Sequence, residues 1–252
     1  MKFRPCFRLL VVLLLGAGRP IQAAPDHLQL FLLIGQSNMA GRGPVGPEDQ
    51  RTNPRIFMLT KDLVWVPAKD PLHQDRPTAG VGLASEFARV IARAEPNASI
   101  GLIPCAVGST SLDQWKAGGK LYQDAVARAR VALRQGTLAG ILWHQGENDS
   151  AADKVATYGD RFAAMISQLR QDLGAGNVPV IMGELGRFRP ASAAFNANLP
   201  AVARRVPLCA YVTAENLTDK GDHLHFDTPS LHVLGARYAA AFMRLEIPPD
   251  HR

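Results

Sequence analysis

The sequence lacks any stretch in which basic and aromatic residues interleave, and aromatic residues make up only 7% of its 252 positions. This absence argues against nucleic acid as a partner. Long apolar runs are missing too. The one unbroken run near the N-terminus, residues 9–15, is far shorter than the ~20 residues that cross a bilayer. No second long apolar segment follows it, so we expect a soluble mature protein with no membrane partner.

The N-terminal segment has three parts in order: charged residues, an apolar run and small residues. Basic residues precede the run at 9–15, no acidic residue stands among them, and small residues lead up to Ala24. This order is typical of a secretory signal peptide. We therefore predict a signal peptide at 1–23, one domain at 24–252, and a secreted or periplasmic location. An uncleaved N-terminal anchor is the alternative. Signal removal takes away four basic residues and leaves a formal net charge of +2.

Five apolar runs have the composition of strands buried on both faces. They lie at residues 28–34, 99–104, 140–143, 178–182 and 210–213. Apolar residues at helical spacing occur between and after them, at 82–94, 121–135, 153–173, 195–205 and 231–245. Strands that alternate with helices predict an α/β domain, with a parallel sheet, right-handed crossovers and helices on both faces.

The segment 41–80 is long, irregular and rich in Pro, Gly and Asp. A loop of this length inside a compact domain is usually functional or disordered. Because it follows a candidate nucleophile directly, we expect it to wall the substrate cleft. It also has the pattern of a short β-ribbon at Ile56–Leu59 and Val64–Pro67.

Cysteine is scarce, with three in the whole chain and only Cys105 and Cys209 beyond the predicted signal. In an exported protein these two could form a disulfide. The predicted topology places them at opposite edges of a parallel sheet, whereas a disulfide requires Cα atoms within ~7 Å. We therefore expect two free, mostly buried thiols.

Two distant segments carry the residue types of a serine hydrolase. Ser37 follows the first predicted strand in Gly35-Gln36-Ser37-Asn38, and Asp222 precedes His225 by three positions near the C-terminus. A serine hydroxyl needs a base to take its proton, and the base needs an acid that orients it. The alternatives are a helix N-cap for Ser37 and a polar surface loop for the second segment. His223 is the rival base, and a metal site there lacks a clear set of further ligands.

Donors for an oxyanion are expected at the same edge of the sheet. The candidates are the backbone N–H groups of Ser37 and Gly108 and the side-chain amide of Gln145. Gly108 could instead be a simple turn glycine, and Gln145 could make a structural hydrogen bond. Glu147 is interpreted as an organiser that holds its loop and not as the base. Gln36 and Asn38 are assigned to the same supporting role.

Together these segments resemble the SGNH hydrolase superfamily, and more narrowly its sialate O-acetylesterase-like branch, which is similar to carbohydrate esterases that include acetylxylan esterases. The matching residues lie in the order Gly35–Gly41, Gly108–Ser111, Trp143–Glu147 and Asp222-x-x-His225. The resemblance implies a three-layer α/β/α flavodoxin-like fold with a five-stranded parallel sheet in the order 2-1-3-4-5.

The resemblance also implies chemistry without metal or cofactor. By matching positions, Ser37 becomes the nucleophile, His225 the base and Asp222 its orienter, while Ser37, Gly108 and Gln145 form the oxyanion hole. Trp115 either borders the substrate or belongs to the core. The function hypothesis is a secreted serine esterase that removes O-acetyl groups from saccharides of the acetylxylan type. The alternatives are a sialate O-acetylesterase, an acetyltransferase with the same residues, and a glycan-binding module without turnover.

Overall fold

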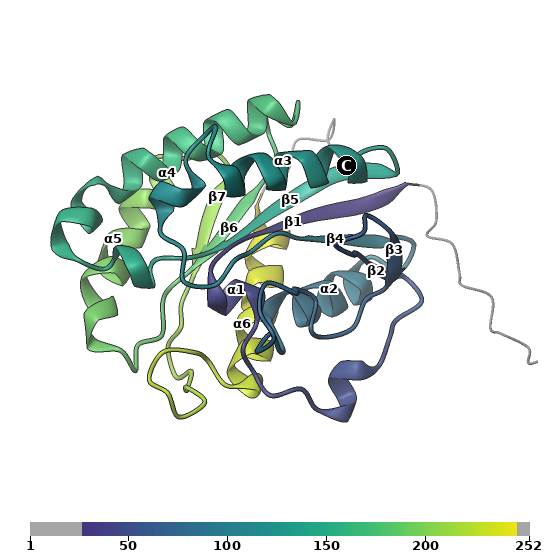
Figure 1. The fold of residues 1–252 in the computed structure, drawn as a ribbon, viewed down its shortest axis with the longest axis horizontal. Helices are drawn as coiled ribbons and strands as arrows, with labels where there is room; N and C mark the ends of the chain where they lie inside the picture. The colour runs from purple at the N-terminus through teal and green to yellow at the C-terminus, as the bar shows by residue number, and fades with distance from the viewer. Residues whose placement is uncertain (1–26, 246–252) are drawn as a thin grey trace, which may run out of the picture.

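A seven-stranded sheet runs through the centre of the protein (Figure 1), which we describe from a computed structural model covering residues 27–245. Its order is β3-β2-β4-β1-β5-β6-β7. The strands are β1 (Leu28–Gly35), β2 (Ile56–Leu59), β3 (Trp65–Pro67), β4 (Ile100–Pro104), β5 (Gly136–His144), β6 (Val180–Gly183) and β7 (Cys209–Val212). Every neighbouring pair is parallel except β2 and β3.

The prediction of a five-stranded sheet is wrong, because the sheet has seven strands. The five predicted strands are present in the predicted relative order, β4-β1-β5-β6-β7, but β2 and β3 extend the sheet beyond β4, so the order of the whole sheet differs from 2-1-3-4-5. The predicted ribbon at 56–59 and 64–67 does form. The sequence did not show that β2 also pairs in parallel with β4, with Ile56 opposite Ile100. A four-residue apolar strand carries no signal for its partner, and this pairing depends on tertiary contacts.

Helices cover both faces of the sheet, as predicted (Figure 1). The helices α2 (Leu83–Ala94) and α6 (Thr228–Arg244) pack on one face. The other face carries α3 (Lys120–Ala132), α4 (Ala152–Asp172) and α5 (Ala193–Arg204). Shorter elements are α1 (Ser37–Ala40) and four 3₁₀ turns: η1 (Pro47–Gln50), η2 (Leu112–Trp115), η3 (Glu147–Asp149) and η4 (Pro190–Ser192).

The central strand β1 is buried on both faces because its side chains alternate between two cores. Leu30 and Leu32 belong to the core under α3–α5, whereas Phe31 and Leu33 belong to the core under α2 and α6. Phe31 meets the rings of Phe87 and Phe242 edge-on, at centroid distances of 4.8 and 5.2 Å. These contacts anchor β1 to α2 and α6, so the residue that follows β1 starts from a rigid position.

Cys105 and Cys209 are free and partly buried, which confirms the prediction of two unpaired thiols. One follows the end of β4 and the other begins β7, so they lie at opposite ends of their strands. Burial raises the pKa of the Cys105 thiol to about 11. The predicted signal peptide at 1–23 lies outside the described residues. Within 27–245, no helix combines the length and apolar character needed to cross a membrane.

Candidate active site

Ser37 stands at the carboxyl end of β1, where the chain turns sharply into α1 (Figure 1). Gly35 has φ = +129°, and a Cβ built on it would lie 2.2 Å from the His144 carbonyl oxygen. Only glycine allows this close approach between β1 and β5. Gln36 occupies the N-cap position of α1 and Ser37 is its first helical residue, so Ser37 is not the helix N-cap. Its N–H therefore has no partner inside the helix.

The Asp222–His225 segment lies against Ser37. His225 Nε2 is 3.1 Å from Ser37 Oγ, and His225 Nδ1 is 2.7 Å from Asp222 Oδ2. These are the contacts that a serine, a base and an orienting acid make in a catalytic triad. His223, the rival base, points elsewhere: its side chain is 83% exposed and its nearest charged partner is Asp219 at 3.6 Å. The structure thus brings together the three predicted residues and leaves His223 outside.

Asp222 is held in its ionised form. Burial raises its pKa, but hydrogen bonds from the His225 ring and from the backbone N–H groups of His225 and Leu224 outweigh burial and hold the pKa well below its usual range. Its Oδ1 accepts the two N–H groups at 2.8 and 3.1 Å. Lys220 Nζ lies 3.4 Å from Oδ2. The carboxylate is therefore a fixed acceptor for the His225 ring.

Asn38 connects the Ser37 turn to the His225 loop. Its Nδ2 donates to the Leu224 carbonyl at 3.2 Å, and its Oδ1 accepts the Phe226 N–H at 3.2 Å. One side chain thus grips the backbone on both sides of His225. Nδ2 also donates to Glu147 Oε1 at 2.5 Å. Asn38 and Glu147, to which the sequence analysis assigned supporting roles, thus contact each other, and Asn38 contacts the His225 loop.

Glu147 is a buried carboxyl, 6% exposed, and its Oε2 has no hydrogen-bond partner. Burial raises its pKa, which hydrogen bonds from backbone N–H groups and Asn38 and the charge of Arg189 partly oppose. Within residues 27–245 its side chain makes no hydrogen bond to His225 or Ser37, and its side-chain partner is Asn38.

Gln145 belongs to a buried network centred on Asp149. Its Nε2 donates to Asp149 Oδ2 at 2.6 Å and also lies 3.1 Å from Gln36 Oε1 and 3.2 Å from the Thr110 carbonyl. Tyr158 OH donates to its Oε1 at 2.9 Å. Because a carboxylate only accepts hydrogen bonds, this arrangement fixes which end of the amide faces Asp149. Both amide hydrogens of Gln145 already have acceptors inside the protein. This is the structural role that the sequence analysis gave as the alternative to an oxyanion donor.

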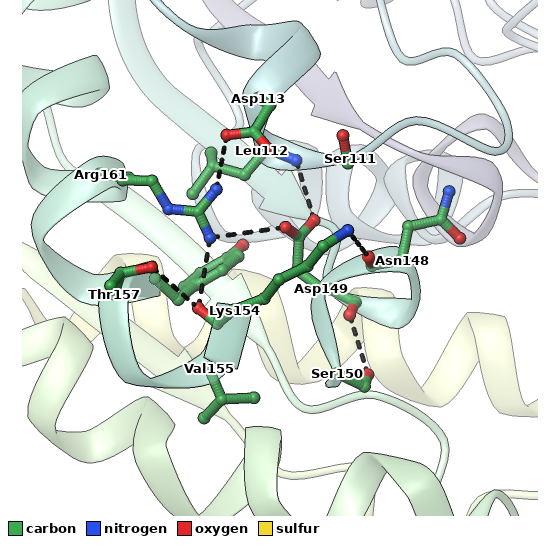
Figure 2. A network of polar contacts seen from close by, with 12 residues as sticks. Ser111, Leu112, Asp113, Asn148, Asp149, Ser150, Lys154, Val155, Thr157 and Arg161 are labelled. Carbon is green, nitrogen blue, oxygen red and sulfur yellow. Dashed lines mark hydrogen bonds and ion pairs between the residues drawn. The ribbon is translucent and has the colours of Figure 1, made fainter. Parts of the chain in front are cut away.

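Figure 2 shows the other contacts of Asp149, which lies between η2 and α4. Asp149 is fully buried, and its Oδ2 accepts the Leu112 N–H at 2.8 Å. Arg161 Nη2 lies 3.6 Å from Oδ1, and Arg161 Nη1 donates to Asp113 at 2.7 Å. Asp149 therefore joins the loop after β4, the loop after β5 and α4. Sequence reasoning missed it, although it follows Gln145 by four positions.

Gly108 also differs from the expected oxyanion donor. Its N–H donates to Asp75 Oδ2 at 2.8 Å, and Asp75 forms a buried ion pair with Arg42 at 2.6 Å. Burial raises the pKa of Asp75, but the hydrogen bonds from Arg42 and Gly108 outweigh it and lower the pKa. Asp75 lies in the long 41–80 segment, which therefore reaches the predicted site as expected. Nothing in the sequence singled out Asp75 among the acids of that segment.

Trp115 belongs to the core. It packs edge-on against Trp143 at a centroid distance of 5.7 Å, and its Nε1 donates to Thr110 Oγ1 at 3.0 Å. No group of three or more His, Cys, Asp or Glu within residues 27–245 is arranged to hold a metal ion.

Comparison with known proteins decides the family. Residues 27–244 match the model of a family described as carbohydrate esterase, sialic acid-specific acetylesterase. This chain belongs to that family. It is accordingly a carboxylic ester hydrolase of the carbohydrate acetylesterase kind, as the resemblance implied.

Individual relatives agree with this family. A probable carbohydrate esterase of Arabidopsis thaliana is 32% identical in an alignment 257 positions long that covers 90% of this chain and 95% of the plant protein. The X-ray structure of that protein superposes with a TM-score of 0.79 at 30% identity, covering 89% of this chain and all of the other. A probable 9-O-acetyl-N-acetylneuraminic acid deacetylase of Escherichia coli (strain K12) is 27% identical in an alignment 202 positions long that covers 60% of this chain and 62% of that protein.

Proposed function

We propose that this carbohydrate esterase removes O-acetyl groups from saccharides through a Ser37–His225–Asp222 triad. The observation that carries the proposal is the pair of contacts that His225 makes, 3.1 Å to Ser37 Oγ and 2.7 Å to Asp222 Oδ2. A histidine between a hydroxyl and an ionised carboxylate can take the hydroxyl proton and be stabilised as imidazolium. Family membership supports the choice of an acetyl ester as the bond that is cleaved.

The reaction proceeds in two steps. Ser37 Oγ attacks the acetyl carbonyl carbon while His225 Nε2 takes the hydroxyl proton. The tetrahedral intermediate then collapses, the sugar oxygen leaves with the proton from His225, and acetyl-Ser37 remains. In the second step His225 deprotonates a water molecule, which attacks the acetyl carbon; the bond to Ser37 Oγ then breaks, His225 returns the proton to Oγ, and acetate leaves. Asp222 holds the ring in the tautomer that leaves Nε2 free in the resting enzyme.

The oxyanion receives its first hydrogen bond from the Ser37 N–H, which opens α1. Gly108 and Gln145 complete the hole in our proposal, and each must then exchange an internal acceptor for the oxyanion. These acceptors are the carboxylates of Asp75 and Asp149. An oxyanion-hole donor contributes about 3 kcal/mol to the transition state, and each exchange gives up a hydrogen bond to a carboxylate that is worth about 1.5–3 kcal/mol.

For the substrate, we propose an O-acetylated sialic acid ahead of acetylated xylan. The family description names sialic acid, and the Escherichia coli relative is a probable deacetylase of 9-O-acetyl-N-acetylneuraminic acid. We also propose that residues 1–23 act as a signal peptide and that the mature enzyme works outside the cytoplasm, because the N-terminal sequence has the order of such a signal.

The test is acetate release from 4-nitrophenyl acetate, 9-O-acetyl-N-acetylneuraminic acid and acetylated xylan. We expect Ser37→Ala to lower kcat on every substrate by about 10³-fold or more, because no nucleophile remains. Ser167→Ala, on the exposed side of α4, is the matched control and should leave kcat unchanged. An active, folded Ser37→Ala variant would overturn the triad. Faster release from xylan than from the sialic acid would overturn the substrate preference alone.

A further inference from the structure

One cavity is lined by none of the three triad residues. It has a volume of about 460 Å³ and lies between the loop that follows β6, helix α5 and strand β7. Polar groups line part of it and apolar surface lines the rest: Glu184, Arg187 and Arg189, with Pro190, Pro200 and Tyr211. Its size is within the range of pockets that hold small molecules.

Its two arginines differ in what they contact. Arg187 donates to both oxygens of Glu184, at 2.8 and 3.0 Å, so its charge is neutralised inside the protein. Arg189 makes one hydrogen bond of 3.3 Å, to the hydroxyl of Ser150, and forms no ion pair within residues 27–245. A half-buried guanidinium with a single long, neutral contact keeps most of its donors for an anion.

The apolar side of the cavity suits a sugar ring. Tyr211 is 40% exposed, although it lies on a strand of the central sheet. An open aromatic face, together with the rings of Pro190 and Pro200, offers apolar contact to the C–H face of a pyranose, while the tyrosine hydroxyl stays available to water or ligand. The combination of a free guanidinium and an aromatic face therefore favours an acidic saccharide.

The cavity is connected to Ser37 through few residues. Arg189 contacts Ser150, whose hydroxyl donates to the Gly146 carbonyl at 2.9 Å. Gly146 precedes Glu147, the partner of Asn38, which in turn follows Ser37. Arg189 also lies near enough to Glu147 for its charge to act on that carboxyl. The loops that carry Arg189 and His225 also lie against each other, because Phe188 meets Phe226 edge-on at a centroid distance of 5.3 Å.

We propose that this cavity is a subsite for the carboxylate-bearing part of an acidic saccharide, with Arg189 as the residue that binds the carboxylate. The inference rests on the proposed esterase function and deepens it, since it assigns the choice of acidic over neutral substrates to one side chain. Arg189 contacts no reacting atom, so it should act on substrate binding and leave the chemistry at Ser37 unchanged.

The experiment compares acetate release from 9-O-acetyl-N-acetylneuraminic acid and from its methyl ester, in which the carboxylate is masked. The kcat/KM of the wild type should be about 10- to 100-fold higher for the free acid than for the methyl ester, with the difference in KM and not in kcat. A ratio of this size is expected from charge-assisted hydrogen bonds. Arg189→Gln should abolish the preference and leave 4-nitrophenyl acetate hydrolysis within about twofold of wild type. Arg189→Lys should keep part of the preference, and the exposed Arg204→Gln should keep all of it.

Two results would overturn the proposal. The first is an equal wild-type kcat/KM for the acid and its methyl ester. The second is a loss of 4-nitrophenyl acetate hydrolysis in Arg189→Gln as large as the loss on the sialic acid, which would mean that Arg189 acts through Glu147. Calorimetric titration of Ser37→Ala with N-acetylneuraminic acid separates the subsite from catalysis. Binding that disappears in the Ser37→Ala, Arg189→Gln double variant supports the subsite even if the wild type releases no acetate, an outcome that would sink the esterase proposal alone.

Discussion

At the scale of single residues, the geometry of the proposed triad depends on a side chain that takes no part in the chemistry. Asn38 donates to the carbonyl before His225 and accepts from the N–H after it, and its own backbone adjoins Ser37. The separation of nucleophile and base is therefore set by one amide group. Glu147 keeps that amide in its orientation, because a carboxylate acceptor selects the nitrogen end.

We expect Asn38→Ala to lower kcat by about 10²-fold, since a displacement of about 1 Å between reacting groups can have that effect. KM for 4-nitrophenyl acetate should change little, because Asn38 does not line the path of a small ester. Asn198→Ala is the matched control: it too removes a partly buried amide that donates to a backbone carbonyl, at 3.1 Å on α5. If both variants lose the same small fraction of kcat, Asn38 only stabilises the fold.

The residues of the triad could be predicted because each has a local signal: a serine after a buried strand, and an acid three positions before a histidine. The carboxylates Asp75 and Asp149 could not. Each accepts a backbone N–H from a residue far along the chain, Gly108 in one case and Leu112 in the other. Such pairings exist only after the loops meet. The sequence therefore could not predict that Gly108 and Gln145 already donate hydrogen bonds to carboxylates.

At the scale of elements, the turn between β1 and α1 is the part that presents Ser37. Gly35 lets β1 lie against His144 of β5, and the Gln36 N–H donates to the His144 carbonyl at 2.9 Å. The start of α1 is therefore held by two adjacent strands: it continues directly from β1, and it is hydrogen-bonded to β5. This explains why a helix of only four residues can hold a nucleophile.

Gly35→Ala should lower the free energy of unfolding by about 3 kcal/mol or more, because the new Cβ would overlap the His144 carbonyl and the backbone would stay at positive φ. Gly174→Ala serves as control: Gly174 also has positive φ, +63°, but a Cβ there has nothing within 4 Å. Its cost should be about 1 kcal/mol. Urea unfolding measures both. Equal losses in the free energy of unfolding for the two variants would show that the close approach of β1 and β5 does not require glycine at position 35.

The helices could be predicted because apolar residues recur in them at helical spacing. In α2, for example, Leu83, Phe87 and Ile91 recur at this spacing and are buried. The ribbon of β2 and β3 was also predicted, but its joining to the central sheet was not. β2 reads IFML and is buried along its whole length, which fits a strand in the middle of a sheet as well as half of an isolated ribbon. Its parallel pairing with β4 is a property of the assembled domain.

At the scale of the whole molecule, one buried acid links the 41–80 segment to the rest of the protein. Asp70 is 1% exposed, and its Oδ2 has no hydrogen-bond partner. Burial raises its pKa from 3.8 to about 6, against the hydrogen bond from the Gly82 N–H and the charge of Arg89. The folded protein therefore binds a proton more tightly here than the unfolded chain does.

The sign of the effect on stability follows from this difference. The contribution of Asp70 is fully present below pH 4 and is lost as the pH rises through about 6, which amounts to about 3 kcal/mol in the free energy of unfolding. Asp70→Asn should remove this term, so the variant should gain stability relative to wild type between pH 5 and pH 7.5. Thermal unfolding at both pH values, with the exposed Asp62→Asn as control, measures it. A gain that does not depend on pH would contradict the assignment.

The two borders of the sheet have a consequence for the behaviour of the protein at high concentration. The outermost strands, β3 and β7, have three and four residues, and β3 ends in Pro67. Exposed strand borders are the usual templates for pairing between chains, and short length and proline are features that block such growth. The extension of the sheet beyond β4 thus caps a longer and wholly apolar strand, which would otherwise offer open backbone groups to a neighbouring molecule and seed aggregation.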